Sequence, residues 1–232
     1  TCALPIFQST TPLLAYEFFS ELAVSKVVDH AGVARPFETR TPFYALVEFE
    51  RENNMTDAQV FEAVEQCMEE GWVIDAVMSQ SVAQASALWR LREDISETIS
   101  RWTPYKNDIS STVSKVPELL AAVDEVVHEN YPEWEVVWYG HIGDGNLHLN
   151  ILKPHNLQIE EFKARCNEVS TDIFDAIKAL GGSVSAEHGV GTLKAPYLSY
   201  SKSDSEIDAM RAIKAIFDPD GILNPGKVFS IV

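Results

Sequence analysis

The stretch YGHIGDGNLHLN, from Tyr139 to Asn150, decides the fold of this chain and carries its strongest functional signal. The pair Asp144-Gly145 in its middle is typical of a two-residue β-hairpin turn, because glycine tolerates the positive φ that such turns require. Polar and apolar residues alternate on either side, as they do in strands with one buried face. The stretch therefore predicts two antiparallel strands, over 135–141 and 146–152.

A two-residue loop would place His141 directly opposite His148, with Tyr139 opposite Asn150 on the same face of the sheet. Opposed residues have Cβ atoms about 4.5 to 5.5 Å apart, a separation from which two imidazoles reach one divalent ion. The alternative is that both histidines are ordinary half-buried sheet residues, and an error in register would undo the pairing. A symmetric pair beside Asn150 favours a metal-binding or catalytic role.

A second polar cluster contains the adjacent residues Glu187 and His188, which lie between Gly181-Gly182 and Gly189-Val190-Gly191. Glycines let a backbone approach a ligand closely. Neighbouring side chains on extended backbone point in opposite directions, so one residue would be a carboxylate ligand and the other a base. By itself the pair could also be a solvated loop. Two histidines and one carboxylate leave open positions on an ion, as catalysis requires.

Outward from these clusters, helices and strands mix without strict βαβ alternation, which predicts an α+β fold. Gly181-Gly182 is expected to end a helix. The spacing of apolar residues predicts helices over 14–28, 57–70, 81–100, 117–130, 160–180, 189–198 and 205–217, and further strands over 43–49, 73–78 and 106–113.

The composition excludes several classes of protein. The 35 acidic residues exceed the 18 Lys and Arg and give a net charge of -17, which disfavours binding to nucleic acid or to an anionic membrane. No apolar run approaches the roughly 18 residues of a membrane span. The three cysteines form no CxxC pattern, so we expect neither a disulfide framework nor a thiolate zinc site. A reducing compartment fits best: the cytoplasm, or the mitochondrial matrix in a eukaryote.

Three ordered motifs, at 140–148, 182–191 and 221–227, resemble the signatures of the C-terminal domain of FAD-linked oxidases. The sequence LWRLRE at 88–93 is similar to the helix on which the family carries an arginine that binds substrate. The resemblance covers residues 1–232. It implies a ferredoxin-like α+β domain, with antiparallel sheet flanked by helices, that caps a flavin. The FAD-binding domain that precedes this region in the family would be absent from this chain.

The resemblance also implies roles for individual residues. A zinc-type ion would be held by His141, His148 and Glu187, while His188 would accept the proton of the substrate hydroxyl. The residues implied to bind substrate are Arg92, Ser96, Lys106 and Asn150, and Asn224 would touch FAD. Ser96 departs from the threonine found in the relatives that use 2-hydroxyglutarate.

Arg92 has a competing interpretation, because arginines on acidic helices usually make solvated pairs one turn away, and Glu93 and Glu97 are near. Arg90 is the other candidate for the carboxylate-binding role.

The implied activity is oxidation of a D-2-hydroxyacid, such as D-2-hydroxyglutarate or D-lactate, to the 2-oxoacid by hydride transfer to FAD. Electrons would then pass to an acceptor protein or a quinone. This chain by itself is expected to be inactive. The first alternative is a metal-dependent hydrolase, which flavin binding would exclude. The second is a non-catalytic domain, either a metal-binding domain or an interaction domain whose polar hairpin is incidental, and metal content would test the interaction domain.

Overall fold

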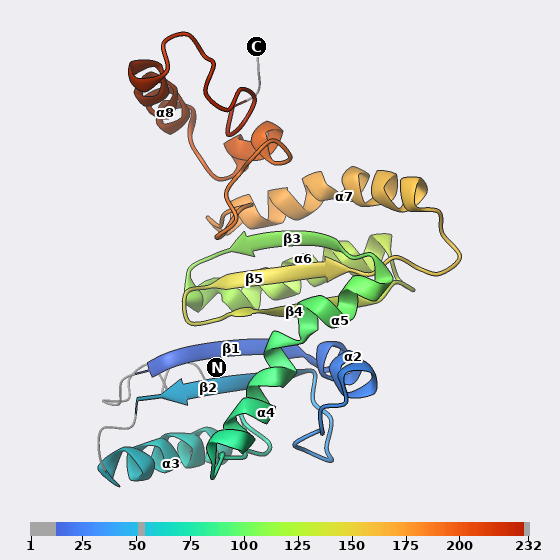
Figure 1. The fold of residues 1–232 in the computed structure, drawn as a ribbon, viewed down its shortest axis with the longest axis vertical. Coiled ribbons are helices and arrows are strands. Elements are labelled where there is room, and N and C mark those ends of the chain that lie inside the picture. Colours follow the sequence, from blue (N-terminus) through green and yellow to red (C-terminus); the bar gives the residue numbers. More distant parts are fainter. Residues whose placement is uncertain (1–12, 51–53, 230–232) are drawn as a thin grey trace. The chain divides into compact units, whose positions relative to one another are not determined.

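The computed structural model describes residues 13–50 and 54–229 (Figure 1). The chain divides into two compact units between Arg101 and Trp102, and each unit is described by itself. Both units combine antiparallel strands with helices, so the predicted α+β class is confirmed. Among the described residues, no helix has both the length and the apolar character needed to cross a membrane.

The first unit is built on the antiparallel pair β1 (Leu13–Ser20) and β2 (Phe43–Phe49), in which Ser20 lies opposite Phe43. Helix α2 (Glu21–Ala31) follows β1 directly and ends at Gly32, whose φ of 66° is the left-handed conformation that favours glycine. The other helices of this unit are α3 (Asn54–Glu69), α4 (Val82–Glu93) and α5 (Ile95–Ile99), followed by the 3₁₀ turn η1 (Ser100–Trp102).

Three sequence predictions in this unit are wrong, two of them in part and one entirely. Residues 13–20 form a strand where a helix over 14–28 was expected, because pairing with β2 overrides a spacing of apolar residues that also fits a helix. Residues 73–78 form no strand. The helix expected over 81–100 is interrupted at Asp94, which caps α4 and precedes α5.

The second unit contains a three-stranded antiparallel sheet in the order β4 (Val136–His141), β5 (Asn146–Ile151), β3 (Tyr105–Ser110). Helices α6 (Val116–Asn130) and α7 (Ile159–Ala179) cover one face, which we call the helix-covered face. Trp138 on β4 donates to Asp124 on α6 over 2.7 Å. The fully buried side chains of this unit include Ile109, Leu119, Val123, Leu147, Leu149, Ile151, Phe162, Ile173 and Ile177.

The rest of this unit joins and follows the sheet. The 3₁₀ turn η2 (Val113–Lys115) precedes α6, and α7 ends in the predicted way at Gly181, whose φ is 69°. The chain then passes through the 3₁₀ helix η3 (Ala195–Tyr200) to α8 (Asp204–Phe217), which begins with a capping box between Ser203 and Glu206.

The register of β4 and β5 differs from the prediction by two residues. His141 lies opposite Asn146, and Tyr139 lies opposite His148, so the loop comprises the four residues 142–145. The Asp144 side chain accepts a hydrogen bond from the backbone N–H of Asn146 over 3.0 Å, and this bond closes the wider turn. The direct pairing of His141 with His148 was therefore wrong. Because side chains alternate with a period of two, both histidines nevertheless lie on the same face.

Candidate metal and catalytic site

The face of the second sheet opposite the helix-covered face carries a row of polar side chains, and we call it the open face. Asp108 on β3 lies opposite His148 on β5, and Tyr139 on β4 lies on the other side of His148. The ring centre of His148 is 4.8 Å from that of Tyr139 and 5.7 Å from that of His141. The sheet therefore gathers both histidines around one position, as diagonal rather than direct neighbours.

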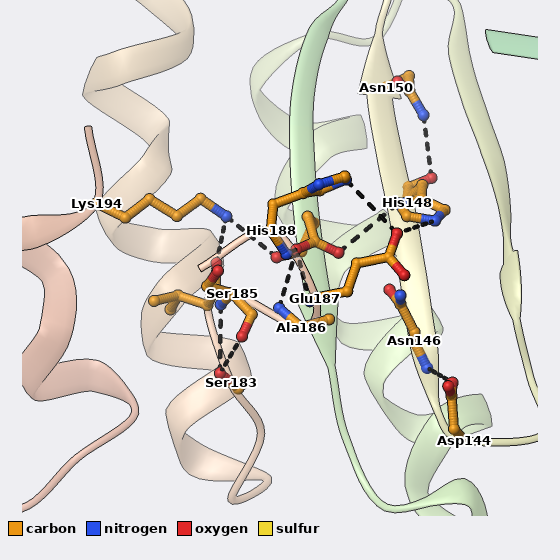
Figure 2. Close-up of polar contacts among 12 residues, drawn as sticks. Asp144, Asn146, His148, Asn150, Ser183, Ser185, Ala186, Glu187, His188 and Lys194 are labelled. Carbon is orange, nitrogen blue, oxygen red and sulfur yellow. Dashed lines mark hydrogen bonds and ion pairs between the residues drawn. The ribbon is translucent and has the colours of Figure 1, made fainter. Parts of the chain in front are cut away.

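The segment 183–188 brings the second cluster to the same position. Ser183 pairs with Ser110 at the edge of β3 through two backbone hydrogen bonds of 2.8 and 2.9 Å. Figure 2 shows Glu187 and His188 reaching from this segment toward His148. The Oε1 atom of Glu187 is 3.6 Å from Nε2 of His148 and 3.5 Å from Nε2 of His188.

The donor atoms fit a divalent ion. Asp108, His148, Glu187 and His188 each offer one ligand atom, and these atoms lie within 4.8 Å of one another. Bonds of about 2.0 to 2.2 Å place two ligands of a tetrahedral ion roughly 3.4 Å apart, close to the separations at Glu187. His141 stands outside this group of four but beside His148.

The cluster passes from buried to exposed. The side chains of Asp108 and His148 are 9% and 12% exposed, whereas those of Glu187 and His188 are 45% and 70% exposed. A small molecule could therefore reach Glu187 and His188 while Asp108 stays covered within this unit.

Two residues that lie at this site, Asp108 and Lys194, were not identified from the sequence. Oδ2 of Asp108 accepts hydrogen bonds from the backbone of segment 183–188, and Nζ of Lys194 donates to the carbonyls of Asp108 and Val184. Burial lowers the pKa of Lys194 from 10.5 to about 8, against an opposing effect of the Asp108 charge. Asp108 had one signal in the sequence, because aspartate is uncommon inside a strand.

Two residues predicted to bind substrate also lie on this sheet. Lys106 is exposed on β3 and lies opposite Asn150 on β5. Asn150 is 1% exposed, and its amide nitrogen donates to the carbonyls of Val137 and His148 over 3.4 and 3.2 Å. Its Oδ1 atom is buried without a hydrogen-bond partner among the described residues.

The remaining predicted site residues lie elsewhere in the chain. In the first unit Arg92 is buried and its Nε donates to Glu17 over 2.8 Å, whereas Arg90 makes the exposed pair one turn away, with Asp94. An exposed ion pair one helical turn away was considered as the alternative role of Arg92. The structure shows such a pair for Arg90 and not for Arg92. Ser96 lies on α5, and Asn224 is exposed in the turn after α8 with a φ of 46°.

Comparison with known proteins identifies relatives of the whole chain. Residues 1–228 match the family described as FAD linked oxidases, C-terminal domain. A D-2-hydroxyglutarate dehydrogenase of Stutzerimonas stutzeri is 55% identical over 98% of this chain and 49% of its own length. A protein of the same name from Xanthomonas citri pv. viticola is 46% identical over 96% of this chain and 47% of its own length. The chain thus spans about half the length of these relatives.

A solved structure supports the fold. The 4-ethylphenol oxidase of Gulosibacter chungangensis, in its isoeugenol complex, matches with a TM-score of 0.58 over 93% of this chain and 47% of that protein. Its sequence identity is 12%, so this likeness concerns the fold alone.

Proposed function

Because this chain belongs to the family of C-terminal domains of FAD-linked oxidases, we propose that it forms the substrate- and metal-binding part of a flavin-dependent D-2-hydroxyacid dehydrogenase. The relatives named D-2-hydroxyglutarate dehydrogenase make D-2-hydroxyglutarate the first substrate to test. The observation that carries the proposal is the meeting of His148, Glu187 and His188 on the open face.

The proposed ligands of a zinc-type ion are His141, His148 and Glu187. Nε2 of His148 and Oε1 of Glu187 face each other at 3.6 Å, and His141 is the next imidazole on the same face. When bound, the ion would supply a positive charge that lowers the pKa of the substrate hydroxyl.

His188 is the proposed base. Its Nε2 atom lies 3.5 Å from Glu187, and its exposed ring is open to a substrate held at the same position. A neutral imidazole near pH 7 is well matched to accept a hydroxyl proton. FAD, when bound, would supply the hydride acceptor, with Asn224 as a contact from this chain.

The substrate carboxylates are assigned to Lys106, Arg92 and Ser96, with Asn150 as a further contact. The bond from Nε of Arg92 to Glu17 fixes the orientation of its guanidinium, a group whose geometry matches a carboxylate. We further propose an acceptor protein or quinone as the electron acceptor, and a cytoplasmic location, or the mitochondrial matrix in a eukaryote.

Metal content tests the ligand assignment. The chain titrated with zinc in a calorimeter should bind one equivalent, and His148→Ala should lose most of this affinity because one of three ligands is gone. His128→Ala is the matched control, since His128 is exposed on α6. Full-strength binding of one equivalent by His148→Ala would rule out the assignment.

Flavin reduction tests the reaction. A flavin-loaded, full-length enzyme that contains this chain should lose its yellow colour when it is mixed without oxygen with D-2-hydroxyglutarate or D-lactate. The substrate that bleaches the flavin faster is the preferred one. A flavin that stays oxidised with every D-2-hydroxyacid would rule out the proposed dehydrogenase reaction.

A further inference from the structure

We infer that Asp108 is a positioning residue that organises both sides of the candidate site, with one carboxylate oxygen holding the backbone at Glu187 and His188 and the other orienting the ring of His148. The effect of Asp108 on metal binding rests on the proposed function. Its effect on the ring of His148 and on the backbone at Glu187 and His188 does not, because it depends only on contacts within the chain.

The first arm of this arrangement is a set of backbone hydrogen bonds. Oδ2 of Asp108 accepts from the amides of Ala186, Glu187 and His188 over 3.1, 3.0 and 3.0 Å. Three consecutive amides that converge on one oxygen form a concave anion-binding turn, which fixes the φ and ψ of the residues that contribute them. Both functional side chains of this segment therefore start from a backbone that Asp108 holds.

The second arm faces His148. Oδ1 of Asp108 is buried, has no hydrogen-bond partner among the described residues and lies 3.8 Å from Nδ1 of His148. On the other side of the same ring, Nε2 lies 3.6 Å from Glu187. A carboxylate beside Nδ1 favours the tautomer that carries its proton there, which leaves the lone pair of Nε2 for an ion next to Glu187.

Asp108 is better placed to orient the ring than to bind the ion itself. Its Oδ2 atom is occupied by three amides, and its Oδ1 atom faces the ring nitrogen that is turned away from Glu187. One imidazole gives one nitrogen to one ion, so an ion between His148 and Glu187 uses Nε2.

Lys194 supports the position of Asp108 from the backbone side. Its Nζ atom donates to the carbonyl of Asp108 over 3.1 Å and also to the carbonyl of Val184. The lysine thus ties β3 to the start of the segment whose later amides Asp108 binds.

The decisive variant is Asp108→Asn, which keeps the size of the side chain and one acceptor oxygen. With its oxygen on the three amides, its NH₂ group would donate to Nδ1 of His148 and move the ring proton to Nε2. Nitrogen-15 NMR of the metal-free chain at about pH 8, above the reference pKa of histidine, should show a proton on Nδ1 in wild type and on Nε2 in the variant. The same tautomer in both proteins would overturn the inference.

Amide hydrogen exchange tests the backbone arm. In Asp108→Ala the amides of Glu187 and His188 should exchange at least about tenfold faster than in wild type, because each loses its acceptor. Asp124→Asn is the matched control, since Asp124 accepts its hydrogen bond from Trp138 on the helix-covered face. Unchanged exchange in an Asp108→Ala chain with a native circular dichroism spectrum would overturn this arm.

Zinc titration tests whether the contacts of Asp108 with the backbone and with His148 affect metal binding. Loss of an orienting partner should weaken zinc binding by about 10- to 100-fold in Asp108→Asn. Unchanged affinity, or complete loss of binding as for a missing ligand, would contradict a positioning role. If wild type binds no zinc, the proposed metal site fails, whereas the tautomer and exchange measurements still decide whether Asp108 positions His148 and the segment.

Discussion

Glu187 and His188 are neighbours in the chain that take different places around His148. Oε1 of Glu187 lies between the two rings, while His188 is the more exposed of the pair. Glu187→Gln should therefore lose zinc. In a full-length enzyme that contains this chain, His188→Asn should keep zinc and FAD but reduce FAD about 10² to 10⁴ times more slowly, because the hydroxyl proton loses its acceptor. Stopped-flow bleaching of the flavin with a D-2-hydroxyacid measures this, and a wild-type rate in His188→Asn would exclude it as the base.

Lys194 gives the second unit a pH-dependent stability. Burial lowers its pKa from 10.5 to about 8, so between these values the folded chain has released a proton that the unfolded chain still holds. The free energy of unfolding should therefore rise as the pH increases from about 8 to about 10, by on the order of 2 kcal/mol from this residue.

Urea unfolding at both pH values measures this effect. Lys194→Met should remove this part of the rise, and Lys163→Met, which changes an exposed lysine on α7, should keep it. An equal rise in wild type and Lys194→Met would assign the effect to other groups.

The sequence was sufficient to single out four of the residues that meet at the site, His141, His148, Glu187 and His188, because histidines and glycines at short spacing are local signals. Asp108 was missed because its partners are distant in the chain. The amides that it binds lie 78 to 80 positions further along. Contacts of this kind follow from the pairing of strands and not from any nearby pattern.

The β4–β5 hairpin depends on a close approach at Gly140. A Cβ atom there would overlap the backbone carbonyl of Asn146, and a backbone atom cannot rotate away as the end of a side chain can. We expect Gly140→Ala to lower the free energy of unfolding by about 1 to 3 kcal/mol and to weaken zinc binding, since Asn146 and His148 share a strand.

Thermal unfolding and zinc titration check this prediction. The control is Gly181→Ala, where a Cβ would meet no atom within 4 Å but the φ of 69° is unfavourable for alanine. It should lose stability without a change in zinc affinity. If Gly140→Ala left both stability and zinc affinity unchanged, the close approach would have no role in shaping the site.

Element boundaries were predictable wherever one periodic pattern dominated. Helices α6 and α7 and strands β4 and β5 begin and end within one residue of the sequence prediction. The prediction failed at β1, where the order of apolar residues fits both a helix and a strand. There the choice is made by β2, more than 20 residues later, which supplies the hydrogen-bonding partner.

For the molecule as a whole, the relatives are about twice as long as this chain. We expect the 232-residue chain by itself to be colourless and inactive toward 2-hydroxyacids, because the family resemblance places most contacts to FAD in a preceding domain. Absorbance between 350 and 500 nm (approximately the flavin bands) after incubation with FAD and gel filtration is sufficient to test this. One equivalent of bound flavin would place the cofactor site within this chain.

The four-residue loop between β4 and β5 also separates two kinds of change in the length of this hairpin. The buried side chains of Leu147, Leu149 and Ile151 fix which face of β5 is covered, so residues added within 142–145 should lengthen the loop and leave His148 on the open face. A single residue added inside β5 before His148 would instead shift the alternation of its side chains. Libraries of insertions should therefore retain zinc binding when the added residues lie at 142–145 and weaken it when one residue is added within β5.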